Sequence, residues 1–389
     1  MTAPVFQALV GQDAVVEELT AAAEAAATGG GGMTHAWLFT GPPGSGRSVA
    51  ARAFAAALQC PRRGCGDCAT CHTTLSGSHG DVTHVVPDGL TIGVATMRDL
   101  IAAASRSPST GNRQILLVED ADRLTEAAGN ALLKSIEEPP ARTVFLLCAP
   151  SANPAEISVT IRSRCRLVAL VQPSVDAVAE LLTRTDNADP ATAALYAAAA
   201  QGHIGRARRL VTDVEARQRR ESILAIPRQL SSVSACFVAA DQLIAAAESE
   251  AAAANDGIAE RERAELEMAL GKGGTGKGAT KATRGSAGVI KDLERRQKMR
   301  LTRAQRDTLD RALIDLAAFY RDVLLIGLGS TVSPIHPDVG DIARSASQKW
   351  TAESVLRRID AILHCRESID ANVRPRIAVE SMMLKLWKG

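Results

Sequence analysis

A glycine-rich turn between an apolar stretch and an alanine-rich stretch constrains the fold of this chain more than any other feature. The residues "HAWLFT" lead into "GPPGSGRS", and "VAARAFAAALQC" follows. A buried strand, a glycine-rich turn and a helix in this order are the context of a phosphate-binding loop, whose pattern is G-x-x-x-x-G-K-[ST]. The residues that fit this loop are Gly41, Gly44, Gly46 and Ser48. Arg47 stands at the lysine position, and arginine is a bulkier planar cation that does not simply replace lysine at a tight site. The loop alone leaves two alternatives open, an altered nucleotide site and a tight turn without a ligand.

A second stretch, "GKGGTGKG" at residues 271–278, has a lysine, Lys277, at the matching position. No strand precedes it, because "RERAELEMAL" is typical of a helix, and its last residue is Gly278 rather than serine or threonine. A phosphate loop needs the strand before it and the helix after it. We interpret residues 271–288, which are rich in glycine, lysine, threonine and alanine, as a flexible basic linker between two helices.

Strand-like and helix-like stretches alternate in the first part of the chain. Apolar strand-like runs occur in "HAWLFTG", "DVTHVVP", "RQILLVEDADRL" and "TVFLLCAP", and helical stretches separate them. This alternation predicts an α/β domain with a parallel sheet at residues 1–171. Residues 172–212 and 213–389 show helical spacing, so we expect a small helical domain and then a larger all-α domain.

The composition is that of a globular protein and narrows the functional classes. The 45 basic and 43 acidic residues give a net charge of +2, which does not indicate a nucleic-acid-binding protein. Aromatic residues make up 3% of the chain, which argues against base-stacking platforms. The first residues lack a signal-peptide pattern, and no apolar run reaches the ~18 residues that a membrane span needs. We expect a cytoplasmic protein whose eight cysteines are thiols or metal ligands.

Four of these cysteines form the most specific local pattern. Cys60, Cys65, Cys68 and Cys71 follow the spacing C-x4-C-x2-C-x2-C. Four thiolates this close in sequence predict a closed tetrahedral zinc site, and its role is structural because the protein fills every ligand position. A [4Fe–4S] cluster, which four cysteines also bind, and a group of buried or redox-active cysteines stay as alternatives.

Two acidic residues follow the apolar run "ILLV". In phosphate-loop enzymes an aspartate at this strand end holds magnesium, and a neighbouring group orients the attacking water. Here the order is Glu119 and then Asp120, so each carboxylate differs by one methylene from that arrangement. Since small displacements at a reacting centre are costly, this is a second departure from a hydrolytic site besides Arg47. A solvated acidic strand end is the alternative.

Three arginines, Arg162, Arg164 and Arg166, lie close together in "TIRSRCR" at the end of the α/β domain. An arginine at a domain edge can stabilise charge on a triphosphate that a neighbouring subunit holds. The string alone favours the simpler interpretation, a solvated basic surface.

These motifs together resemble the clamp-loader subunits of bacterial DNA polymerase III, which are AAA+ proteins. The resemblance rests on "GPPGSGRS", the four cysteines, "EDADRLTEAAGNALLKSIEEPP" and "SRC", in this order, and covers roughly residues 9–170. It implies an AAA+-type P-loop domain, a small helical lid domain and an all-α collar domain used for oligomerisation. It also implies a hetero-pentamer with motor (gamma/tau) and delta subunits, the sliding clamp as cargo, and primer-template DNA bound through the assembly.

Within this family the motor subunits carry intact lysine and Asp-Glu motifs, whereas the delta-prime subunit resembles them in fold and has a degraded nucleotide site. This chain has Arg47, Glu119-Asp120 and an intact Ser163-Arg164-Cys165, which is the delta-prime combination. The resemblance implies that Arg164 acts in trans as an arginine finger on ATP held by an adjacent motor subunit, and that this chain itself hydrolyses little or no ATP. The alternatives are an active ATPase motor of the same assembly and a separate zinc-bearing nucleic-acid-binding module.

Overall fold

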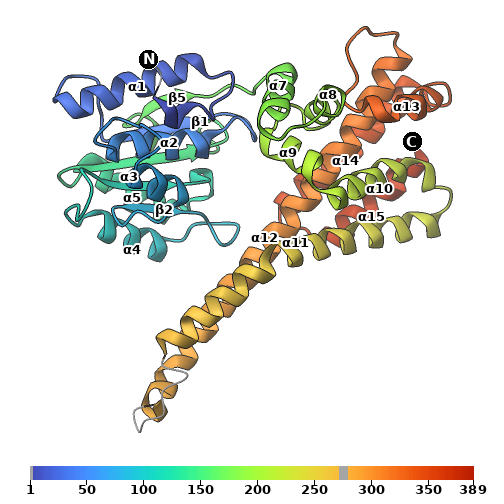
Figure 1. Ribbon diagram of the computed structural model, residues 1–389. Coiled ribbons are helices and arrows are strands. Elements are labelled where there is room, and N and C mark those ends of the chain that lie inside the picture. Colours follow the sequence, from blue (N-terminus) through green and yellow to red (C-terminus); the bar gives the residue numbers. More distant parts are fainter. Residues whose placement is uncertain (1–2, 271–278) are drawn as a thin grey trace. The chain divides into compact units, whose positions relative to one another are not determined.

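The chain divides into two compact units, residues 1–208 and 209–389, and the computed structural model describes residues 3–270 and 279–389 (Figure 1). The second loop with Lys277 lies outside the described residues. Helix α12 (Ala279–Gly327) begins directly after residues 271–278, so residues 279–288 belong to a helix rather than to the expected linker. Alanine, lysine and arginine, which favour helices, are frequent in that stretch. The division into three domains stays a prediction.

A five-stranded parallel sheet forms the centre of the first unit and confirms the predicted fold class. Its strands lie in the order β2-β3-β4-β1-β5. Their bounds are β1 (Ala36–Thr40), β2 (Val82–Val85), β3 (Gln114–Val118), β4 (Thr143–Ala149) and β5 (Arg166–Ala169). Every residue of β1, β3 and β4 is buried, as expected for parallel strands that are covered on both faces.

Helices cover both faces of this sheet (Figure 1). The helices of the first unit are η1 (Pro4–Phe6), α1 (Asp13–Thr28), α2 (Arg47–Gln59), α3 (Ala69–Ser76), α4 (Val94–Ala104), η2 (Ala121–Arg123), α5 (Glu126–Glu137), α6 (Val159–Arg162), α7 (Val175–Thr185), α8 (Pro190–Ala199) and α9 (Ile204–Thr212). Successive strand residues point to opposite faces. Trp37 and Phe39 therefore pack with α1 and α2, and Leu38 packs with α4 and α5.

Local signals in the sequence explain where several of these helices begin and end. Thr125 caps α5 by accepting a hydrogen bond from the Ala128 amide, and Pro139 and Pro140 follow its last turn. Asp189 caps α8, where Pro190 takes the first helical position. Helix α2 is rich in alanine, whose small side chain lets the helix lie close to the sheet.

The second unit is all helical, in agreement with the predicted C-terminal region. Its helices are α10 (Val214–Gln229), α11 (Val233–Ala269), α12, η3 (Pro337–Val339), α13 (Gly340–Ser347), α14 (Ala352–Asp370) and α15 (Pro375–Lys388). Figure 1 shows α11 and α12 side by side as a long hairpin. A core around Leu313, Phe319 and Met383 joins α12 to its neighbours. Within the described ranges, no helix combines the length and the apolar character that a bilayer crossing requires.

Candidate functional site

The glycine-rich loop and the acidic strand end lie at the same edge of the sheet. Strands β1 and β3 are parallel, so the loop that follows Thr40 and the residues that follow Val118 both lie at the carboxyl ends of strands. Ligands of open parallel sheets bind at this edge. The structure thus brings the predicted nucleotide-site residues together, although their roles stay predictions.

The loop is closely packed against its surroundings at two of its glycines. A Cβ atom at Gly41 would lie 2.6 Å from the carbonyl oxygen of Leu170. A Cβ atom at Gly44 would lie 2.6 Å from the Cγ atom of His203, at the turn between α8 and α9. Both glycines also have positive φ angles, +154° and +89°. The loop therefore requires glycine at these positions, and the imidazole of His203 lies directly against it.

Arg47, the residue in place of the lysine, is directed into its own loop. Helix α2 begins at Arg47, and the guanidinium Nη1 donates a hydrogen bond of 2.9 Å to the Gly41 carbonyl oxygen. The side chain thus links the two ends of the loop, where the pattern would have a lysine that reaches outer phosphates. This hydrogen bond between Arg47 and the Gly41 carbonyl stabilises the conformation of the loop.

Glu119 is engaged by a histidine that the sequence analysis missed. His84 Nε2 of β2 lies 2.7 Å from Glu119 Oε1, and both side chains are about one-fifth exposed. Burial alone would raise the pKa of Glu119, but the hydrogen bonds from His84 and Ser48 lower it below the ordinary value. The only sequence signal for His84 was a polar residue inside the strand-like run "DVTHVVP".

The second acid, Asp120, has a different environment. Its backbone adopts a left-handed conformation with φ of 49°, and its carboxylate lies 3.9 Å from Arg123 Nε. Asp122, two residues later, has a raised pKa because it is partly buried and close to Asp120. Of these acids, Glu119 is the one whose pKa Ser48 of the loop helps to lower, and serine is a residue type that ligates magnesium in phosphate-loop proteins.

The four cysteines form one compact cluster. The Sγ atoms of Cys60, Cys65, Cys68 and Cys71 all lie within 4.8 Å of one another. Cys60 Sγ is 3.6 Å from that of Cys65 and 3.7 Å from that of Cys68. Four sulfurs at about 2.3 Å from one zinc ion would be about 3.8 Å apart in a tetrahedron, so this arrangement can hold a single metal ion. A [4Fe–4S] cluster fits less well, because each sulfur would bind a different iron atom.

Local structure positions these thiols. Cys60 follows the last residue of α2, and Cys68 caps α3, a short helix that the sequence analysis did not predict. The backbone amide of Cys71 donates to the Cys68 sulfur at 3.4 Å and lowers the pKa of this thiol to about 6. Burial raises the pKa of Cys71. A metal would favour the thiolate form of all four.

The three arginines of "TIRSRCR" separate into different roles. Arg166 lies 2.6 Å from Glu18 and 4.9 Å from the ring centre of Trp37, so it packs the sheet edge. Arg162 donates a long hydrogen bond of 3.4 Å to the Ala152 carbonyl. Arg164 Nη2 lies 2.7 Å from Glu137 at the end of α5, and the Arg164 side chain is 39% exposed.

Comparison with known proteins finds relatives of the first unit among the subunits of DNA polymerase III. The family described as "DNA polymerase III, delta subunit" matches residues 11–174. A Pseudomonas aeruginosa DNA polymerase III subunit delta' is 37% identical over 165 residues, which cover 41% of this chain and 50% of the relative. The Escherichia coli delta' subunit is 36% identical over 36% of this chain and 43% of its own length. Residues 11–174 are therefore similar to the corresponding part of delta-prime clamp-loader subunits.

The same region is also similar to the gamma/tau subunits of DNA polymerase III. A Mycobacterium tuberculosis DNA polymerase III subunit gamma/tau is 34% identical over 164 residues, which cover 41% of this chain and 27% of the relative. The chain spans about half the length of the delta-prime relatives, and the matched region ends within its first unit. Overall identity therefore does not separate the two subunit types.

Proposed function

We propose that this chain is a delta-prime-like subunit of the DNA polymerase III clamp loader. In this role it is a largely non-hydrolysing member that helps to load the sliding clamp onto primed DNA. Its partners would be gamma/tau motor subunits and a delta subunit in a hetero-pentamer. The observation that carries the proposal is the hydrogen bond from Arg47 to the Gly41 carbonyl, because a cation tied to the loop does not serve an outer phosphate in the way that lysine does.

Internal contacts at the site support this proposal. His84 supplies a cationic or hydrogen-bonding partner to Glu119, where a phosphate-loop enzyme would use magnesium. His203 lies against Gly44 of the loop. Bound ATP and magnesium would have to replace or rearrange these contacts, so we expect nucleotide to bind weakly and turnover to be low.

Arg164 would supply the chemistry of this chain to a neighbour. Its guanidinium is exposed in part and bonded at its two terminal nitrogens to Glu137 and the Thr160 carbonyl. An arginine placed against the phosphates of a neighbouring subunit stabilises the charge that develops during phosphoryl transfer. Arg164 is the candidate because it is the arginine of the Ser163-Arg164-Cys165 motif on which the resemblance to clamp-loader subunits rests.

The test uses the reconstituted clamp loader with Arg164→Ala in this chain. An arginine finger contributes about 10³-fold or more to the rate at the site that it serves, so the ATPase rate of that site should fall by about this factor. Arg162→Ala, two residues away, is the matched control and should leave the rate unchanged. An unchanged rate with Arg164→Ala in a correctly assembled complex would rule out the finger.

We also propose that the four-cysteine cluster binds zinc in a structural role. Its sulfur distances agree with tetrahedral coordination, and the four protein ligands leave no position for a substrate. The ion would link the end of α2 to α3 and to the N-terminal residues, where the Val5 amide donates to the Gly64 carbonyl.

An active ATPase motor of the gamma/tau type is the second candidate. It is favoured by the contact between Ser48 and Glu119, which places a magnesium-ligating residue type beside a strand-end carboxylate. The identity to gamma/tau relatives is also close to the identity to delta-prime relatives. ATP turnover by the isolated chain separates the two functions.

A further inference from the structure

The α11–α12 hairpin of the second unit carries positive charge on one face of α12. Between residues 289 and 306 the chain has seven lysines and arginines and two acidic residues. Lys291, Arg295 and Lys298 recur at helical spacing and therefore share one face, which Thr302 and Arg306 continue. The side chains of Lys291, Arg295 and Lys298 are exposed, and within the described parts of the chain none has an ion-pair or hydrogen-bond partner.

Contacts on the opposite face fix the orientation of α12. Glu262 of α11 accepts hydrogen bonds of 2.8 and 2.5 Å from the two terminal nitrogens of Arg300. Gln297 donates to the Ala259 carbonyl, and Leu293 is buried. Since these residues face α11, the side chains of Lys291, Arg295 and Lys298 are directed away from it. We call this row of cations the α12 track. Two exposed acids, Asp292 and Glu294, lie on either side of it and limit its width.

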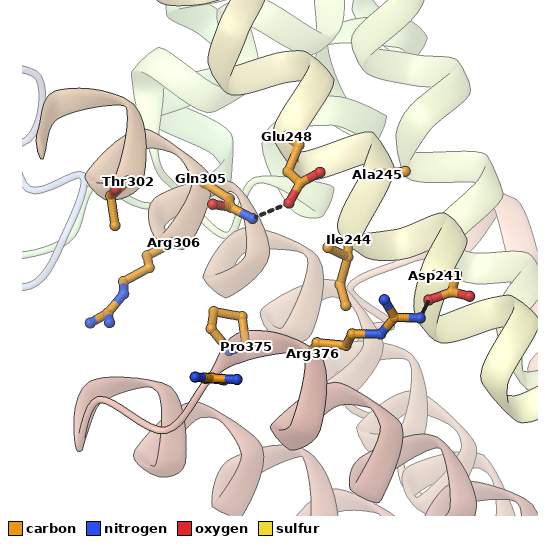
Figure 2. Close-up of a pocket in the computed structure, with 10 residues that line it drawn as sticks. Asp241, Ile244, Ala245, Glu248, Thr302, Gln305, Arg306, Pro375 and Arg376 are labelled. Atoms are coloured by element: carbon orange, nitrogen blue, oxygen red, sulfur yellow. Dashed lines mark hydrogen bonds and ion pairs between the residues drawn. The ribbon is translucent and has the colours of Figure 1, made fainter. Parts of the chain in front are cut away.

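The track ends at a cavity of about 370 Å³ between α11, α12 and α15, which Figure 2 shows. Thr302, Arg306 and Arg374 line this cavity at the N-terminus of α15. Arg306 donates to the neutral side chain of Asn372 at 3.0 Å, and the guanidinium of Arg374 has no hydrogen-bond or ion-pair partner among the described residues. Two cations without a carboxylate partner beside a helix N-terminus favour an anion.

The acidic residues of the cavity are already engaged. Asp241 lies 2.7 Å from Arg376, and Glu248 accepts a hydrogen bond of 3.0 Å from Gln305 (Figure 2). Arg376 also pairs with Glu380 at 3.0 Å. The cations at the end of the track are therefore Arg306, which continues the α12 spacing of Lys291, Arg295 and Lys298, and Arg374 at the start of α15.

The ligand that fits is a polymer with regularly spaced negative charges. From Lys291 to Arg306 the track extends about 22 Å, at 1.5 Å per helical residue. Duplex DNA carries one negative charge per about 1.7 Å of its axis, so a straight row of this length faces several phosphates of the two strands. The sequence has no aromatic residue between Phe237 and Phe319, and base stacking on a single strand needs such residues. These features favour duplex over single-stranded DNA.

We propose that the α12 track (Lys291, Arg295, Lys298, Arg306 and Arg374) binds the phosphate backbone of duplex DNA without reading its sequence. This contact would be made by the chain itself, and it does not depend on the proposed non-hydrolysing role. Five neutralised phosphates predict a slope of about −4.5 for log K against log salt concentration.

The experiment measures fluorescence anisotropy of a labelled DNA duplex with the full chain, from about 50 to 200 mM salt. In the variant Lys291→Glu/Arg295→Glu/Lys298→Glu the slope should fall to about −2 and the affinity should drop at least tenfold. Glutamate is as good a helix former as lysine, so circular dichroism should show an unchanged helix content. The matched control Lys349→Glu/Lys385→Glu/Lys388→Glu makes the same change of charge at exposed lysines elsewhere in the unit.

Binding with the steep slope, lost in the α12 variant and kept in the control, would support the proposal. Three results would overturn it: no binding of the wild-type chain at low salt, equal losses in the two variants, or tighter binding of the corresponding single strand than of the duplex.

Discussion

At the scale of single residues, two side chains at the glycine-rich loop and the neighbouring strand end bond to groups of the chain itself. Arg47 bonds to the Gly41 carbonyl, and His84 bonds to Glu119. Both contacts satisfy groups that would otherwise need an external partner. These two hydrogen bonds are the structural basis for the low ATP turnover that we propose.

The His84 contact predicts a pH effect. The pKa of Glu119 is lower in the folded than in the unfolded chain, where it is about 4.3. The ionised carboxylate therefore stabilises the fold above about pH 4.3, and this stabilisation is lost as the pH falls through the folded pKa. His84→Ala should therefore raise the pKa of Glu119, measured by NMR titration, and lower the unfolding free energy at pH 7 by about 1 kcal/mol. His364→Ala, at an exposed histidine of the second unit, should change neither quantity. A Glu119 pKa that is the same in wild type and variant would contradict the assignment.

Asp81 provides a second test at this scale. Its buried carboxylate accepts five hydrogen bonds from the backbone and hydroxyl groups of residues 109–111. Burial would raise the pKa of Asp81, but the amides of these residues lower it far below its ordinary value. Asp81→Asn replaces one accepting oxygen by an NH2 group, which is a donor and would face other donors. The free energy of unfolding at pH 7, measured by urea denaturation, should therefore fall by about 3 kcal/mol. Its stability should also vary less between pH 5 and pH 2, because a carboxylate with a lowered pKa loses its contribution there. The exposed Asp99→Asn serves as control, and equal stability of the two variants would show that the bonds contribute little.

At the scale of elements, the cysteine module joins α2, α3 and the N-terminal residues. The wild-type chain should contain one zinc ion by metal analysis, and Cys68→Ser should lose it and lower the melting temperature. Loss of a ligand also removes binding free energy that contributes to folding. The control Cys165→Ser changes a half-buried cysteine outside the cluster and should keep the zinc. A metal-free wild-type chain, or a Cys68→Ser variant as stable as wild type, would contradict the zinc proposal.

The elements that the sequence could predict are those with strong local signals. The buried runs that became β1, β3 and β4 and the capped helix α5 follow from hydrophobic pattern and helix-end residues. The contacts of His84, His203 and Glu137 could not be predicted in this way. Each of them joins residues far apart in the sequence, and only the order of the strands brings these together. The spacing of the cysteines gave the ligand set, but helix α3 between them is too short to show a periodic pattern.

At the scale of the whole molecule, the proposed function assigns ATP hydrolysis to neighbouring gamma/tau subunits and the arginine finger to this chain. A subunit that keeps the scaffold of a nucleotide site and donates Arg164 to a neighbour needs no turnover of its own. Both the finger and the clamp-loading role would be visible only in the assembly, whereas the state of the loop is a property of the isolated chain.

ATP turnover by the purified chain with magnesium is therefore the most direct measurement of the central claim. We expect little or no hydrolysis by the wild-type chain, and the same rate for Arg47→Ala. Hydrolysis by the wild-type chain that Arg47→Ala abolishes would contradict it, and would show that Arg47 serves the phosphates of an active motor subunit.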